Sequence, residues 1–132
     1  MQITRQADYA IRAVLYLSSL NSSDRAATSR IAENQGIPPS FLAKIISQLS
    51  IAGLIHTSRG AKGGVTLAKD PGSISLLDVV EAIDGPVSLN QCTIDPLECV
   101  RSSNCPMHSF WCEAQTELVS RLGSTSFARF VN

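Results

Sequence analysis

The stretch 28–68 constrains the fold of this chain more than any other part of the sequence. Residues 28–35 are expected to form a short helix, which Gly36 ends because glycine most easily takes the left-handed conformation there. Pro38 and Pro39 can start a second helix, since the first N–H groups of a helix need no internal partner. Its buried stripe comprises Leu42, Ile45, Ile46 and Leu49. Two short helices joined through a glycine-containing turn are typical of a helix-turn-helix.

The opposite face of this second helix carries small or polar side chains rather than a row of Glu and Lys. These residues are Ser40, Ala43, Lys44, Ser47 and Gln48. In a helix-turn-helix, the amino-terminal part of the second helix enters the major groove, where such side chains can contact base edges. The sequence therefore favours double-stranded DNA as a partner.

After Gly53 the pattern changes from helical to strand-like, which predicts two strands over 54–58 and 65–68. The segment RGAKGG that joins them is basic and rich in glycine. Such a tip can approach a phosphate backbone closely, and an arginine on it, here Arg59, can enter a narrow minor groove. Because it directly follows a helix-turn-helix, this hairpin is interpreted as a wing.

Further helices are expected on both sides of this region. One covers about 4–20 with Thr4 as its N-cap, and another covers about 75–84 with a capping-box pattern at its start. A long helix is expected from about 106 to 123, and a short helical turn at 126–130. The predicted fold is therefore mainly α with a small β-hairpin, a winged helix-turn-helix with a long C-terminal helix.

The chain is expected to divide into three parts. These are a winged helix-turn-helix DNA-binding region over 1–85, a cysteine-rich loop over 86–105, and a dimerisation helix with a C-terminal tail over 106–132. The stripe of the last helix comprises Met107, Phe110 or Trp111, Ala114, Leu118 and Leu122. This stripe follows a complete winged-helix core and needs a partner surface, for which a second copy of the chain is favoured. The alternative is that this helix folds back on the first helix.

Charge is distributed unevenly along the chain. Residues 1–70 carry eight Lys and Arg against four acids, a net charge of +4, and residues 71–132 carry three against seven, a net charge of −4. This asymmetry indicates a polyanion partner for the front half. Arg5, Asp8 and Arg12 interrupt any apolar run at the amino end, so we expect a cytoplasmic protein with no membrane segment.

All four cysteines of the chain lie within residues 92–112. Cys92, Cys99 and Cys105 read C-x6-C-x5-C, and His108 follows three residues after the last of them. In a reducing compartment such a group is more often a metal or redox site than a disulfide framework. Structural zinc sites usually place two ligands only two to four residues apart, whereas the longer gaps here suit the wider iron-sulfur cluster. Zinc, or a thiol switch without metal, is the alternative.

The sequence offers three candidates for a fourth ligand. His108 and Cys112 lie one and two helical turns beyond Cys105, if the helix starts at Pro106. Asp8 would need the first helix, or its copy in a partner subunit, beside the cysteine-rich loop. Each has a structural alternative, in which His108 is a polar helix-start residue, Cys112 a buried spacer and Asp8 an i,i+4 partner of an arginine.

The chain resembles the Rrf-type winged-helix regulators, the family that includes IscR, NsrR and RirA. The resemblance covers nearly the whole chain. Its most specific parts are ITRQADYAIRAVLYL at 3–17, IPPSFLAKIISQLSIAGLIHTSRGAKGGVTLAKD at 37–70, ISLLDVVEAIDG at 74–85, and the three cysteines with CPMHSFW after the loop. Members of this family are dimeric transcription factors, mostly repressors, and many bind a 2Fe-2S or 4Fe-4S cluster through these cysteines.

The resemblance implies roles for particular residues. Cys92, Cys99 and Cys105 would be cluster ligands. DNA contacts would come from Ser40, Phe41, Lys44 and Gln48 on the second helix and from Arg59 and Lys62 on the wing. IscR-like members use a histidine that His108 matches, and NsrR-like members use an aspartate of the other subunit that Asp8 matches, so cluster type stays open. A first spacing of six residues departs from the IscR-like pattern.

The expected function is that of a transcriptional repressor whose operator binding is controlled by an iron-sulfur cluster that senses redox state, nitric oxide or iron and cluster status. The alternative is a winged-helix regulator that uses its cysteines as a disulfide or zinc switch. An enzyme with a small-molecule substrate is not expected, because the chain lacks a C-x-x-C pair, a glycine-rich nucleotide loop and a second acid, base or nucleophile group.

Overall fold

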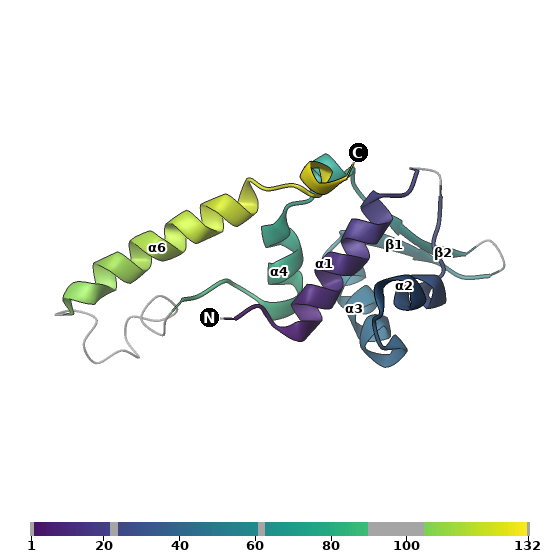
Figure 1. Cartoon of the computed structure of the whole chain (residues 1–132), viewed down its shortest axis with the longest axis horizontal. Helices are drawn as coiled ribbons and strands as arrows, with labels where there is room; N and C mark the ends of the chain where they lie inside the picture. Colours follow the sequence, from purple (N-terminus) through teal and green to yellow (C-terminus); the bar gives the residue numbers. More distant parts are fainter. Residues whose placement is uncertain (1, 22–23, 61–62, 90–104, 132) are drawn as a thin grey trace.

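A computed structural model describes residues 2–21, 24–60, 63–89 and 105–131 (Figure 1). The elements are, in chain order, α1 (Arg5–Ser18), α2 (Thr28–Gln35), α3 (Pro39–Ile51), β1 (Ile55–Ser58), β2 (Gly64–Leu67), η1 (Pro71–Ser73), α4 (Leu76–Asp84), α6 (Pro106–Gly123) and η2 (Phe127–Phe130). The expected fold class, mainly α with a small β-hairpin, is confirmed. No helix in the described ranges is long and apolar enough to cross a bilayer.

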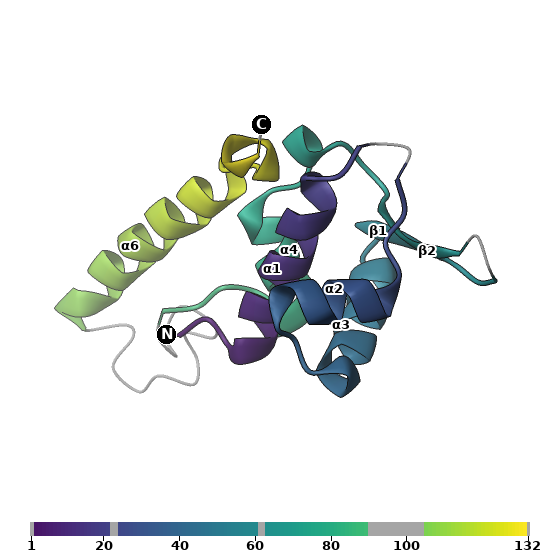
Figure 2. The same ribbon diagram turned by 45° about the vertical axis from the view of Figure 1, so that its right-hand side comes forward.

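Helices α1 to α4 pack around one hydrophobic core. We call these helices, together with the hairpin attached to them, the head. The two predicted caps are present in it. Thr4 accepts a hydrogen bond from the N–H of Ala7 at 3.1 Å, and Ser75 and Asp78 form a reciprocal capping box with two bonds of 3.0 Å. These caps begin α1 and α4, which contact each other along the core. Figure 2 shows α2 in front of α3 beside these two helices.

The hairpin pairs β1 with β2 in antiparallel register, with Ile55 opposite Leu67. Each strand begins within one residue of its expected start. The segment before α2 also joins the hairpin, because the N–H of Val65 donates to the carbonyl of Ala26 at 2.8 Å and the reverse bond is 3.1 Å. This bridge attaches the wing to the helix-turn-helix at a second point, so the two should move together.

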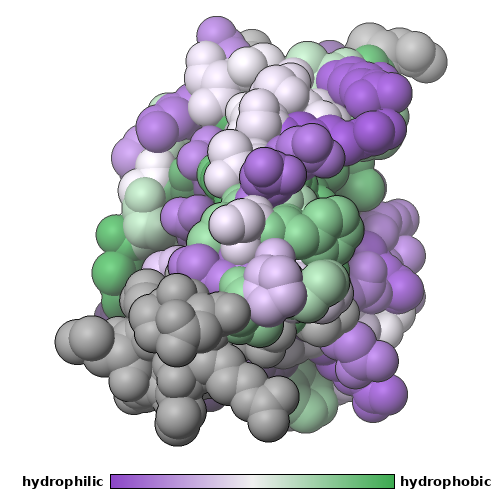
Figure 3. All heavy atoms as spheres, turned by 90° about the vertical axis from the view of Figure 1, so that its left-hand side faces the viewer, coloured by the Kyte–Doolittle hydropathy of each residue, from purple (hydrophilic) through white to green (hydrophobic). Residues whose placement is uncertain are grey.

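Helix α6 extends away from the head and packs against α4 of its own chain (Figures 1 and 2). None of its described side chains is fully buried. Trp111, Leu118 and Leu122 are half-buried, whereas Met107 and Phe110 are 46% and 53% exposed. Figure 3, which views the molecule from the side of α6, shows apolar surface interspersed among polar side chains. The last helix therefore keeps apolar side chains in contact with solvent.

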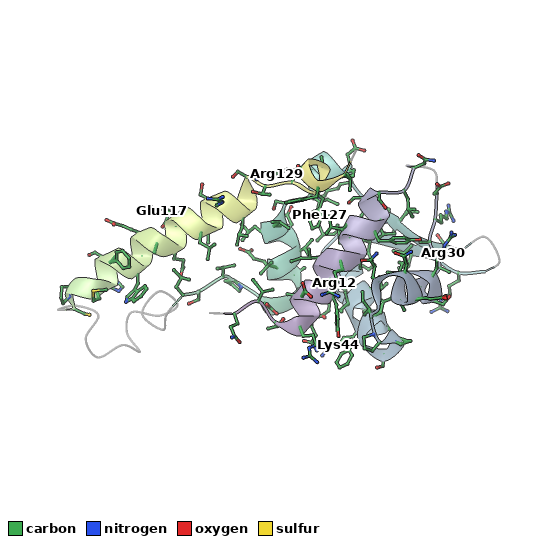
Figure 4. The ribbon with its side chains drawn as sticks, in the orientation of Figure 1. Arg12, Arg30, Lys44, Glu117, Phe127 and Arg129 are labelled. Carbon is green, nitrogen blue, oxygen red and sulfur yellow. The ribbon has the colours of Figure 1, made fainter. Side chains whose placement is uncertain are left out.

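After α6 the chain returns to the head. Phe127, in η2, is 0% exposed and belongs to the same core as α1 and α3. Its N–H donates to the carbonyl of Ile74 at 3.0 Å, and the N–H of Leu76 donates to the carbonyl of Thr125 at 2.9 Å. The far end of α6 is thus anchored beside the start of α4 (Figure 4).

Candidate functional site

The helix-turn-helix forms as the sequence predicts. Gly36 ends α2 with φ 64° and ψ 37°, a left-handed conformation that glycine adopts without steric cost. Ile37 is buried behind it. The predicted stripe of α3 is confirmed, and its exposed fractions are 0% for Leu42, 1% for Ile45, 8% for Ile46 and 0% for Leu49. This burial fixes which face of α3 meets solvent.

The solvent face of α3 carries the predicted DNA-contacting side chains. Ser40, Phe41 and Lys44 are exposed, and Gln48 is half-buried. Figure 4 shows Lys44 at the lower edge of the head, on the side opposite Arg129. No side chain among the described residues caps the start of α3, and the helix sequence contains no acidic residue, so this end is favourable for an anion. The arrangement suits a negatively charged surface such as DNA.

The wing lies on the same head and carries Arg59, which is exposed just after β1. Lys62, the other predicted wing contact, lies outside the described residues. Gly63 makes a very close turn, since a Cβ placed there would lie 2.4 Å from the carbonyl oxygen of Ser58. Only glycine fits that position without moving the backbone. The wing therefore has a defined shape where β1 and β2 meet its tip.

A chain of contacts leads from α1 to the solvent face of α3. Arg12 and Asp8 form an i,i+4 ion pair at 3.0 Å, with both side chains 49% exposed. The Arg12 guanidinium lies 6.0 Å from the centre of the Tyr9 ring, and that ring is 6.2 Å from the ring of Phe41 on α3. An exposed pair of this kind contributes about 0.3–0.5 kcal/mol to stability. Asp8 thus pairs with Arg12, as expected if Asp8 is an ion-pair partner on α1 rather than a metal ligand.

The start of α6 carries part of the predicted metal site. Cys105 is the residue just before the helix, and His108 and Cys112 follow on it. Cys105 and Cys112 form no disulfide within the described ranges. Sγ of Cys112 is 3.7 Å from Nε2 of His108. Cys92 and Cys99 lie outside the described residues, and within the described ranges no three potential ligands gather around one point.

The donors that the structure describes suit a soft metal ion or an iron-sulfur cluster. Thiolates and imidazole are the ligands that such centres prefer. In addition, Nδ1 of His108 is buried and has no hydrogen-bond partner in the described part of the chain. A buried nitrogen without a partner calls for an explanation, and a bound metal would supply one. Cys105 and His108 therefore fit the iron-sulfur cluster or soft metal ion that the sequence predicts.

Two long-range hydrogen bonds tie down the segments on either side of residues 90–104. Oγ1 of Thr4 donates to Asp84, the last residue of α4, at 2.6 Å. The N–H of Leu89 donates to Oε1 of Gln115 on α6 at 3.1 Å. Sequence reasoning missed both, because residues 80 and 26 positions apart leave no local pattern. They connect the segment that precedes residues 90–104 to α1 and to α6.

Comparisons with known proteins agree with this fold. The family model Rrf2, described as iron-dependent transcriptional regulator, matches residues 3–132. The HTH-type transcriptional regulator IscR of an Enterobacter species is 30% identical over 132 residues, which are 100% of this chain and 80% of that protein. A Mycobacterium tuberculosis protein named "Putative HTH-type transcriptional regulator Rv1287" is 39% identical over 88 residues, 67% of this chain, and that match spans 55% of the relative's length.

A solved structure shows the same fold. The structure of CymR, the global cysteine regulator of B. subtilis, has a TM-score of 0.80 and 22% identity, covering 97% of this chain and 94% of that one. The relatives are transcriptional regulators and not enzymes, as the sequence analysis expects. Since the family model covers nearly every residue and one relative is 30% identical along the whole chain, this chain belongs to the Rrf2 family of iron-dependent transcriptional regulators.

Proposed function

We propose that this chain is a DNA-binding transcriptional repressor, acting as a cytoplasmic homodimer, whose operator binding is controlled by an iron-sulfur cluster. The observation that carries the proposal is the solvent face of α3. Ser40, Phe41 and Lys44 lie exposed there on a helix without acidic residues, and Arg59 is exposed on the attached wing. Family membership supports the same function.

DNA binding would divide between base and phosphate contacts. Side chains on the amino-terminal half of α3 would contact base edges in the major groove, with Lys44 suited to the O6 and N7 acceptors of guanine. Arg59 and Lys62 would neutralise phosphates or enter the minor groove beside the wing. Two heads in a dimer would meet half-sites about 34 Å apart, so their separation decides how well both bind.

Dimerisation is proposed through α6, which presents Met107 and Phe110 to solvent. Replacing Phe110 with Glu would place a charge in the apolar surface that a second copy covers, which is costly to bury. We expect Phe110→Glu to be monomeric by light scattering and to bind a two-half-site operator weakly. Glu113→Gln, at an exposed neighbouring position, is the matched control and should stay dimeric. A dimeric Phe110→Glu protein would argue against α6 as the interface.

Cys92, Cys99 and Cys105 are proposed to hold the cluster, with His108 as the fourth ligand. When bound, a cluster would supply an iron centre that reacts with oxidants and nitric oxide. His108 is preferred to Asp8 because its buried Nδ1 has no hydrogen-bond partner in the described ranges, whereas Asp8 already pairs with Arg12. Asp8 of a partner subunit remains the alternative that a ligand substitution would reveal.

The protein's own contacts can carry a change at the ligands to the DNA-binding head. Gln115 holds the backbone at Leu89 against α6, and Thr4 holds Asp84 against the start of α1. Tyr9 on α1 in turn touches Phe41 on the recognition face. A rearrangement of the ligands would therefore shift both α6, the proposed dimerisation helix, and α3. A small change in the separation of two heads is enough to weaken binding to fixed half-sites.

The DNA-binding proposal is tested by operator affinity over a range of salt, on a duplex selected from a random pool by the wild-type protein. Arg59→Ala should lower the slope of log affinity against log salt by about 0.9, the share of one phosphate. Lys44→Ala should cost about 1–3 kcal/mol and relax sequence preference at one base pair. Arg129→Ala removes an exposed cation on the opposite side and should change neither quantity. Wild-type binding by both Lys44→Ala and Arg59→Ala would refute the proposed interface.

A second candidate keeps DNA binding but replaces the cluster with a disulfide or zinc switch. It is favoured by the free, half-buried thiols of Cys105 and Cys112, which are open to oxidation or to zinc. Iron, sulfide and zinc analysis of protein purified without oxygen separates the two. Visible absorption with matching iron and sulfide supports the cluster, whereas colourless protein with one zinc or none supports the switch.

A further inference from the structure

Cys112 lies one helical turn after His108 on α6, and the two side chains are in contact. Its Sγ is 3.7 Å from Nε2 of His108, and both residues are half-buried. The second ring nitrogen, Nδ1, is buried and has no hydrogen-bond partner in the described part of the chain. The two nitrogens of this imidazole therefore have different surroundings. Nε2 contacts the thiol of Cys112, whereas Nδ1 has no hydrogen-bond partner among the described residues.

A neutral imidazole carries one proton, and its position decides what Nδ1 can bind. With the proton on Nε2, that N–H donates to Sγ of Cys112, and Nδ1 keeps a lone pair that can bind a metal. With the proton on Nδ1, the thiol of Cys112 donates to Nε2 instead, and Nδ1 becomes a buried donor that cannot bind a metal. A metal can therefore bind Nδ1 only when the proton is on Nε2. In that state Nε2–H is hydrogen-bonded to Cys112 and Nδ1 is bound to the metal, so both nitrogens have a partner.

We propose that Cys112 is a positioning residue of the iron-sulfur site, which holds Nε2–H of His108 and so presents Nδ1 as the ligand nitrogen. This inference rests on the proposed function, since it takes His108 as the fourth ligand. Metal-bound histidines commonly donate their other ring N–H to a fixed acceptor, and loss of that acceptor lowers metal affinity by about 10–100-fold. Cys112 is placed to be that acceptor, one turn along the same helix.

The hydrogen bond is tested first in the full chain without metal. The chain has two histidines, and His56, exposed on β1, serves as the internal reference. With ¹⁵N-labelled histidine, two-bond ¹H–¹⁵N correlation spectra report which ring nitrogen carries the proton. We expect His108 to be the Nε2–H tautomer in the wild type and in Cys112→Ser, which keeps an acceptor, and a mixture in Cys112→Ala. An Nδ1–H tautomer in the wild type, or no change in Cys112→Ala, would overturn the inference.

The ligand role is tested in protein reconstituted with iron and sulfide without oxygen. Cys112→Ala should release iron to a chelator at about 10–100-fold lower chelator concentration than the wild type, while Cys112→Ser stays near the wild type. The visible circular dichroism spectrum should shift in Cys112→Ala because the imidazole is no longer held. Glu113→Gln, on the same turn and exposed, controls for changes to α6 and should match the wild type in both readouts.

Two results separate this inference from its alternatives. If Cys112 were itself a ligand, both Cys112→Ser and Cys112→Ala would lose the cluster while His108→Ala kept it, and the inference would be wrong. Colourless wild-type protein would instead show that the proposed function fails. Coloured Cys112→Ala protein that holds iron as tightly as the wild type would leave the proposed function intact and remove only the role given to Cys112.

Discussion

Phe127 offers the sharpest test of how α6 is attached to the head. Its side chain is 0% exposed, although it lies near the end of the chain, beyond a helix with no fully buried residue. η2, which carries Phe127, contacts α1 and η1. Removing a buried phenyl ring loses its transfer free energy and leaves a cavity, a combined cost of about 3–5 kcal/mol. That is a large part of the roughly 5–15 kcal/mol that stabilises a typical domain.

The same magnitude can be expressed as a melting temperature. An unfolding entropy of about 2.1 cal/mol/K per residue gives about 0.28 kcal/mol/K for a chain of 132 residues. We therefore expect Phe127→Ala to lower Tm by roughly 11–18 °C in differential scanning calorimetry. Phe130→Ala is the matched control, because this second phenylalanine of η2 is 52% exposed, and it should lower Tm by no more than about 3 °C. Equal shifts in the two variants would refute the packing of η2 into the core.

Three further substitutions test the wing and the two long-range bonds. Gly63→Ala should distort the wing, because its Cβ would meet a carbonyl of β1, and should weaken operator binding by about 10-fold with little loss of stability. Gly72→Ala is the control and should leave operator binding unchanged. Equal operator affinities of the two variants in a binding titration would contradict this prediction. Thr4→Ala should lower the free energy of unfolding measured in urea by about 1–2 kcal/mol, since it loses both the cap of α1 and the bond to Asp84 at the end of α4. A loss near zero would argue against the bond between Thr4 and Asp84. Gln115→Leu should reduce the difference in operator affinity between metal-loaded and metal-free protein, because it removes the bond to Leu89. Glu117→Gln, at an exposed position of the same helix, is the control and should keep that difference. An unchanged difference in both variants would exclude the Leu89–Gln115 bond as a link between the metal and DNA binding.

Local patterns were enough to predict most of the head. Gly36 after a short helix, the proline pair before α3 and the 3.6-residue spacing of its apolar stripe all act within a few residues, so they are legible in sequence. The same holds for the pair of His108 and Cys112, whose spacing of four residues places them on one face of a helix, where the structure finds them in contact.

The features that were missed depend on the tertiary fold. Phe127 is an aromatic residue in the short segment after α6, and only the return of the chain beside Ile74 explains its burial. The bridge between Ala26 and Val65 joins segments that have no shared pattern. The DNA-contacting and metal-binding roles of the predicted residues stay predictions, and Cys92, Cys99 and Lys62 lie outside the described residues.

The most direct test of cluster-controlled DNA binding is one oxygen-free titration of a selected operator with reconstituted wild-type protein and with a variant in which Cys92, Cys99 and Cys105 are all serine. We expect the two proteins to differ in operator affinity by about 10-fold or more, and oxidation or nitric oxide to change the affinity of the wild type alone. Equal affinities under every one of these conditions would contradict control by the cysteines and leave only a DNA-binding winged helix.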